Sequence, residues 1–212
     1  MDNTLFDLIA AQEMACSAVT AHVGCGTEDD LFQFFLRPDR GFESHDNIRD
    51  YLNHHHLSTD GLYTESCAIY EQVKLASIES YPGVNNVLRE LKSQGYPLGL
   101  VTDAEHRDAH LRLDKLGLLP SFDSMVTFDR VQEKKPSKKP FLLALDELGV
   151  TPEETLLIGD SLRRDIDPCR ELGITTVYAR YGDRFSSTRD NVVADYIIDS
   201  MDELLNIISR IE

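Results

Sequence analysis

The sequence predicts an α/β fold: a parallel sheet core that carries an inserted small bundle of helices. Two observations predict it. From about residue 81 onward, short apolar runs alternate with amphipathic helices, the pattern of a parallel sheet covered on both faces. Residues 8–80 instead repeat apolar side chains at helical spacing, as at Leu8, Ile9, Ala15 and Val19. We therefore expect a core of residues 1–7 and 81–212 and a helical insertion of residues 8–80.

The insertion is divided by segments rich in glycine and proline, and these breaks leave about four helices. In the core, Gly117, Gly149 and Gly173 each follow an amphipathic stretch, at the position where a helix commonly ends. The elements expected along the core are, in order, helix 84–94, strand 97–102, helix 105–116, strand 125–127, helix 140–148, strand 155–158, helix 162–172, strand 175–178, strand 196–198 and helix 202–211.

Composition excludes several classes of protein. The 212 residues include 21 Lys and Arg against 37 Asp and Glu, a net charge of −16, so nucleic acid and anionic membranes are not expected as main partners. No apolar run approaches the length of a membrane span, and no signal peptide is expected. The four cysteines form no Cys-x-x-Cys pair, which favours a cytoplasmic location over a disulfide framework.

Polar residues follow successive strands of the predicted sheet. Thr102 ends one strand, Lys135 follows the next, and Asp160 and Asp165 follow a third; Asp2 stands near the start of the chain. In parallel sheets, ligands bind beyond the carboxyl ends of the strands. Carboxylates suit magnesium, and a lysine with a hydroxyl suits phosphate oxygens. This set of residues predicts a site for a phosphoryl group held with a magnesium ion.

These motifs together resemble the haloacid dehalogenase superfamily, in particular its magnesium-dependent, phosphoglycolate phosphatase-like members with a helical cap. The resemblance spans nearly the whole chain and implies the family's Rossmann-like (Rossmannoid) parallel sheet core with an inserted helical cap. The matching segments are residues 1–7 (MDNTLFD), 81–84 (YPGV), 98–102 (LGLVT), 135–136 (KP) and 159–161 (GDS) with Asp165.

Carried over by position, the resemblance implies a role for each residue. Asp2 is the general acid and base, and its main-chain carbonyl is also a metal ligand. Thr102 and Lys135 bind the phosphoryl group, and Lys135 also compensates the charge of the nucleophile. Asp160 and Asp165 complete the magnesium site. Asp103 matches no required role and is interpreted as part of the loop.

In this family the nucleophile is the first Asp of an Asp-x-Asp motif. If Asp2 is the second Asp of that motif and Met1 is the residue x, the nucleophile falls one position before Met1. The strand that presents it is also not found in the sequence. We therefore expect the start codon to be misassigned and this chain to be N-terminally truncated, with the natural protein beginning roughly ten residues earlier. In an alternative alignment Asp2 is the nucleophile, but Thr4 then occupies the position of the general acid and base.

The implied function is hydrolysis of a small phosphorylated metabolite, a phosphomonoester, through an aspartyl-phosphate. In the insertion, the residues expected to select the substrate are Arg37, Arg40, Glu43 and His45. Two alternatives stay open: a non-catalytic relic of this fold that binds phosphate or metal, and, less favoured, a haloacid dehalogenase that attacks carbon without magnesium.

Overall fold

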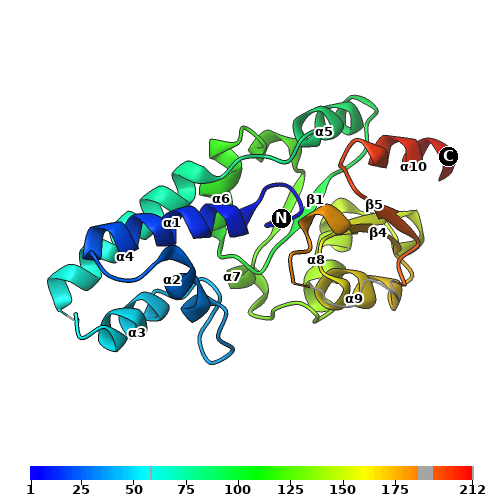
Figure 1. Cartoon of the computed structure of the whole chain (residues 1–212). Helices are drawn as coiled ribbons and strands as arrows, with labels where there is room; N and C mark the ends of the chain where they lie inside the picture. The colour runs from blue at the N-terminus through cyan, green and yellow to red at the C-terminus, as the bar shows by residue number, and fades with distance from the viewer. Residues whose placement is uncertain (58, 186–192, 212) are drawn as a thin grey trace. The chain divides into compact units, whose positions relative to one another are not determined.

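The chain divides into two compact units in the computed structural model, which describes residues 1–57, 59–185 and 193–211. One unit is Leu8–Ile78, and the other combines Met1–Asp7 with Glu79–Glu212 (Figure 1). We call them the helical unit and the core unit.

The helical unit packs its helices around a core of aromatic and aliphatic side chains. Its helices are α1 (Leu8–Val23), α2 (Glu28–Phe35), α3 (Asp46–His54) and α4 (Asp60–Ser77). Thr27 and Thr59 begin α2 and α4 by accepting hydrogen bonds from backbone amides of the first turn. The rings of Phe35 and Tyr70 stack with centroids 4.9 Å apart, and both side chains are fully buried. The apolar residues that repeat at helical spacing in the sequence therefore form one hydrophobic core in this unit.

The core unit alternates strands and helices as expected. Its longer helices are α5 (Val84–Ser93), α6 (His106–Lys115), α8 (Lys139–Leu148) and α10 (Glu203–Ile211), with short helices α7 (Phe128–Val131) and α9 (Asp167–Arg170). Its strands are β1 (Gly99–Val101), β2 (Ser124–Val126), β3 (Leu156–Gly159), β4 (Thr175–Ala179) and β5 (Tyr196–Ile198). In the view of Figure 1, α5 and α10 lie above the strands, and α8 and α9 lie below them.

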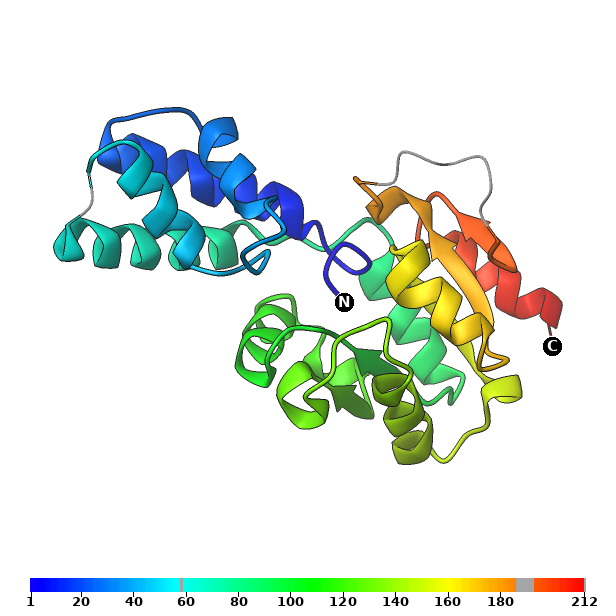
Figure 2. The same cartoon turned by 90° about the horizontal axis from the view of Figure 1, so that it is seen from below.

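All strand pairs of the core unit are parallel, but the described strands form two sheets. β1 pairs with β2, and β3 pairs with β4, which pairs with β5. Figure 2 draws β1 and β2 in green and β4 and β5 in orange, as separate sets of arrows. The parallel sheet predicted from the sequence is therefore present in two parts, with β1 and β3 not paired to each other.

One predicted helix has a different local form. Where a continuous helix 162–172 was expected, the chain makes a π-helical turn over Leu162–Ile166 and then begins α9. The amide of Ile166 donates to the carbonyl oxygen of Ser161, five residues back, at 3.2 Å. Pro168 has no amide hydrogen, so it fits the first turn of a new helix. The break places Asp165 inside the turn rather than on a regular helix.

Candidate active site

The sequence-predicted core residues lie in segments that follow the strands. Thr102 directly follows β1, Asp160 directly follows β3, and Lys135 lies in the loop between α7 and α8. Residues 1–7 form a tight turn in which the amide of Leu5 donates to the carbonyl of Met1 at 2.8 Å. Side-chain hydrogen bonds connect this turn to Thr102, directly after β1, and to Asp160, directly after β3.

Asp2 contacts two other elements of the core unit. Its Oδ1 accepts a hydrogen bond from Nη1 of Arg112 at 2.8 Å, and its Oδ2 accepts a longer one from Thr102 Oγ1 at 3.4 Å. The Arg112 side chain is 4% exposed, so this ion pair is shielded from water on the α6 side. A carboxylate next to the β1 end is therefore held by a buried cation.

Lys135 and Asp165 form a buried ion pair. Lys135 Nζ lies 2.6 Å from Asp165 Oδ1, and the two side chains are 8% and 7% exposed. Burial alone raises the pKa of Asp165, but the charge and hydrogen bond of Lys135 outweigh it and hold that pKa below its usual value. Burial lowers the pKa of Lys135, and the charges of Asp165 and Asp103 more than reverse that shift. Both groups are therefore charged at neutral pH.

Asp160 is the carboxylate with the most unfavourable surroundings in this cluster. Burial, and then the nearby charge of Asp165, raise its pKa to about 6, although a hydrogen bond from Thr4 opposes the shift. Thr4 Oγ1 donates to Asp160 Oδ1 at 2.6 Å. Two neighbouring buried carboxylates of this kind are stabilised by a cation between or beside them.

Two glycines make this packing possible. A Cβ atom on Gly159 would lie 2.4 Å from the Cβ of Asp165, and one on Gly182 would lie 1.7 Å from the carbonyl oxygen of Asn3. Both distances are shorter than any side chain allows. The turn after β3 and the turn of residues 1–7 therefore need glycine at these two positions.

The four residues expected to select the substrate lie in the helical unit and pair with other residues of that unit. Arg37 Nη2 lies 2.6 Å from Asp50 Oδ2, and Arg40 also donates to Asp50. Glu43 accepts from Lys74 at 3.3 Å, and His45 lies 2.8 Å from Glu71. Arg37, Glu43 and His45 are partly exposed, and Arg40 is exposed.

Two core residues of the site were not identified from the sequence. Asp103, interpreted as a loop residue, accepts a hydrogen bond from the Lys135 amide at 2.9 Å, and Arg164 lies 3.5 Å from it. It therefore positions the loop that carries Lys135. Arg112 stands on the apolar face of a predicted amphipathic helix, between Ala109 and Leu113, both fully buried. An arginine at a buried position of a helix requires a buried partner of opposite charge, so Arg112 was the signal in the sequence that could have indicated this ion pair.

The chemistry of the donor set fits a magnesium ion. Asp160, Asp165 and the Asp2 carbonyl offer only oxygen atoms, which magnesium prefers, and two or three protein oxygens with water are its usual shell. Over residues 1–57, 59–185 and 193–211, no group of three or more His, Cys, Asp or Glu side chains is arranged to hold a metal. By chemistry alone, two carboxylates and a carbonyl are compatible with magnesium, which usually keeps several waters in its shell.

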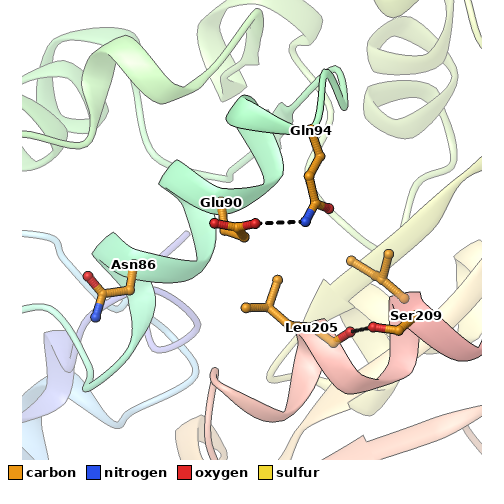
Figure 3. Close-up of a pocket in the computed structure, with 6 residues that line it drawn as sticks. Asn86, Glu90, Gln94, Leu205 and Ser209 are labelled. Atoms are coloured by element: carbon orange, nitrogen blue, oxygen red, sulfur yellow. Dashed lines mark hydrogen bonds between the residues drawn. The ribbon is translucent and has the colours of Figure 1, made fainter.

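A hollow of the core unit lies between α5 and α10 (Figure 3). Its polar side chains hydrogen-bond within their own helices: Gln94 donates to Glu90, and Ser209 donates to the carbonyl of Leu205. This hollow does not include any of Asp2, Thr102, Lys135, Asp160 and Asp165.

No helix in the described part of the chain is long and apolar enough to cross a membrane.

The chain is similar to a known protein family and to several known phosphatases. Residues 1–179 match the profile of the haloacid dehalogenase-like hydrolases. The chain is 33% identical over 151 residues to a glyceraldehyde 3-phosphate phosphatase of Methanocaldococcus jannaschii, covering 71% of this chain and 66% of the relative. It is 36% identical over 130 residues to a phosphoglycolate phosphatase of Nitrosococcus oceani, covering 61% of this chain and 57% of the relative. The matches thus span less than two thirds of these two relatives.

A solved structure has the same fold. The hydrolase YfnB of Bacillus subtilis, determined bound to magnesium, superposes with a TM-score of 0.78 at 22% identity, covering 99% of this chain and 96% of that one. At this identity the likeness concerns the fold alone.

Proposed function

The chain belongs to the haloacid dehalogenase-like hydrolases, and from this premise we propose that it is the scaffold of a magnesium-dependent phosphatase acting on a small phosphomonoester. The observation that supports the proposal is a set of three hydrogen-bonded pairs beyond the strand ends: Thr102 with Asp2, Lys135 with Asp165, and Thr4 with Asp160. The charges of Asp165 and Lys135 also act on Asp160. The phosphatases among its relatives act on small phosphorylated compounds, as their names state.

Each residue has a chemical task in the proposed reaction. Thr102 and Lys135 bind the phosphoryl oxygens, and the lysine charge stabilises the negative charge of the transition state. Asp2 protonates the leaving alcohol and then takes a proton from the attacking water. Arg112 holds the Asp2 carboxylate at 2.8 Å and so fixes its direction. Asp103 holds the Lys135 loop through the backbone.

Asp160, Asp165 and the carbonyl of Asp2 would hold magnesium, which supplies positive charge for a dianionic substrate. Deprotonated Asp160 is needed for this, and its raised pKa means that the ion and a proton compete for the same carboxylate.

The covalent step requires a nucleophilic aspartate, which the family resemblance assigns to the position directly before Met1. Residues 1–212 then carry the acid and base, the phosphate-binding and the metal-binding parts of the site. We expect an aspartyl-phosphate and turnover only from a chain that also supplies that aspartate, and no turnover from residues 1–212 alone.

The helical unit is proposed as the cap that selects the substrate, through the polar segment that contains Arg37, Arg40, Glu43 and His45. Their pairing inside the unit supports a preformed polar surface. We propose a cytoplasmic location because the four cysteines are free thiols.

The experiment compares two proteins: residues 1–212 and the same chain preceded by an apolar strand that ends in Asp. Both are tested with magnesium against p-nitrophenyl phosphate, glyceraldehyde 3-phosphate, phosphoglycolate and nucleotide monophosphates. The expected result is hydrolysis by the extended protein only, with a loss of about 10²-fold or more in kcat for Asp2→Asn and Lys135→Met. Lys134→Met, an exposed neighbour, is the control.

The same measurements separate the alternatives. An extended protein that binds magnesium or phosphate but hydrolyses none of these esters would support the non-catalytic relic. Release of halide from a 2-haloacid without magnesium would support a dehalogenase.

A further inference from the structure

The helical unit holds a thiol and an imidazole in contact, and neither residue has a task in the proposed reaction. Cys25 lies in the turn between α1 and α2, and His55 directly follows α3. Cys25 Sγ lies 3.2 Å from His55 Nδ1, and both residues are partly exposed. The reactive form of a cysteine is its thiolate, and an imidazole at this distance is placed to take the thiol proton. The pair is therefore a candidate for covalent chemistry at sulfur.

The turn that carries Cys25 has a fixed shape. Tyr51 is fully buried, and its hydroxyl donates a hydrogen bond to the carbonyl oxygen of Cys25 at 2.6 Å. The glycines on either side, Gly24 and Gly26, have φ angles of 69° and 70°, which residues with a side chain rarely adopt. A Cβ atom on Gly26 would also lie 2.1 Å from the Tyr51 hydroxyl oxygen. These contacts hold Cys25 next to the end of α3.

Two rings and a carboxylate lie near the imidazole of His55. Its ring centroid is 4.5 Å from that of Tyr51 and 5.0 Å from that of His54. Hydrogen bonds from the side chain and the backbone of Thr27 lower the pKa of Asp30, and the charge of His55 adds to that shift. The attraction between the two charges is mutual, so the Asp30 carboxylate stabilises the imidazolium that forms when His55 takes a proton.

The other three cysteines have surroundings that favour the protonated thiol. Burial raises the pKa of Cys16 to about 12, and burial also raises the pKa of Cys169. Cys67 is partly exposed, like Cys25, but burial raises its pKa as well. Thiols that keep their proton are poor nucleophiles. Cys67 is therefore a comparison for Cys25 within the same chain.

The charges beside Cys25 favour one class of reagent. Glu28, Asp29 and Asp30 form the first turn of α2, which begins three residues after Cys25, and all three are exposed. Such carboxylates attract a small cationic reagent and repel an anionic one. Among small disulfides, those of aminothiols carry positive charge and those of mercapto acids carry negative charge. The first class matches this surface.

We propose that Cys25 is a site of thiol–disulfide exchange with small cationic disulfides, with His55 as the base that activates the thiol. His55 Nδ1 takes the proton of Cys25 Sγ, and the thiolate attacks one sulfur of the small disulfide. A bond forms between Cys25 Sγ and that sulfur while the sulfur–sulfur bond of the reagent breaks. The other half leaves as a thiolate and takes up the proton from His55. Cys25 is oxidised to a mixed disulfide, and the small disulfide is the oxidant.

The test treats residues 1–212 with cystamine, the disulfide of an aminothiol, and follows the mixed disulfide at each cysteine by peptide mass spectrometry. Cys25 is expected to react about tenfold or more faster than Cys67. His55→Gln should slow the reaction of Cys25 by about tenfold or more, and His54→Gln, at an exposed neighbouring position, should leave its rate unchanged. Dithiodipropionate, which carries carboxylates, should react with Cys25 more slowly than cystamine once both rates are divided by those with N-acetylcysteine.

Three outcomes would each overturn the proposal: modification of Cys25 no faster than Cys67, an unchanged Cys25 rate in His55→Gln, or equal normalised rates with the two disulfides. The buried thiol of Cys16 reports in the same samples whether a variant has stayed folded, because unfolding would expose it. The comparison of Cys25 with Cys67 needs no variant. Phosphatase activity is not measured, so this test and that of the proposed function fail independently.

Discussion

Arg112 Nη1 donates a 2.8 Å hydrogen bond to Asp2 Oδ1, which joins α6 to the turn of residues 1–7. The arginine side chain is 4% exposed and the aspartate side chain 20% exposed. The pair therefore lies at the boundary between the packed interior and the candidate site. It connects the stability of the core unit to the orientation of a carboxylate with a proposed chemical function.

Arg112→Met is expected to lower the free energy of unfolding by roughly 1–3 kcal/mol, because it leaves the Asp2 carboxylate without its buried partner. Urea denaturation measures the change. Arg107→Met, at an exposed position of the same helix, is the control and should stay within about 0.5 kcal/mol of the wild type. Equal effects of the two substitutions would show that the pair contributes nothing specific.

Gly159→Ala is expected to displace Asp165, because the new Cβ would lie 2.4 Å from the Asp165 Cβ. The cost is about 1–3 kcal/mol of stability, together with a loss of magnesium binding. Denaturation and isothermal titration with magnesium measure the two effects. Gly61→Ala is the matched control: its Cβ meets no atom within 4 Å, so it should not destabilise. Normal magnesium binding by Gly159→Ala would contradict the packing argument.

The alternation of strands and helices was readable from the sequence because it depends on local periodicity and on glycine at helix ends. The strands β1 to β5 all overlap the predicted segments. The π-helical turn at Leu162–Ile166 was not predicted, because it depends on the tertiary packing of Asp165 against Gly159. Which strands pair with one another depends on long-range contacts, and local periodicity does not report these contacts.

The candidate site was only partly readable. Lys135 and Asp165 were both named, and their ion pair follows from topology, since both follow parallel strands. Asp103 and Arg112 were missed for different reasons. Asp103 accepts a hydrogen bond from the backbone amide of Lys135. Every residue except proline has such an amide, so the sequence does not indicate this contact. Arg112 is part of a helical periodicity and shows only as a charge among apolar neighbours.

Magnesium is expected to raise the thermal midpoint of the wild-type chain, and a chelator should reverse the shift. An ion at about 100 times its Kd stabilises the folded state by about 2.7 kcal/mol. Asp160→Asn should abolish the shift because it removes a proposed ligand. Asp114→Asn, an exposed acid on α6, should retain it. A shift retained by Asp160→Asn would place the ion elsewhere.

In the helical unit, the contribution of Glu71 to stability is expected to disappear in acid. Burial raises the pKa of Glu71, but hydrogen bonds and charges from His45 and Lys74 outweigh it and lower that pKa to about 2. The unfolded chain therefore binds more protons than the folded one between about pH 4.5 and 2, so stability falls as the pH falls through this window. Because the Glu71 side chain is 43% exposed, its contribution to the unfolding free energy is discounted to about 1 kcal/mol.

Glu71→Gln should lower the unfolding free energy by that amount at pH 7, and the difference from wild type should shrink steadily below pH 4.5. Glu65→Gln, whose side chain is 65% exposed, should show a smaller difference at pH 7. A Glu71→Gln effect that stayed constant from pH 7 to pH 3 would mean that packing, and not the charge of Glu71, stabilises this cluster.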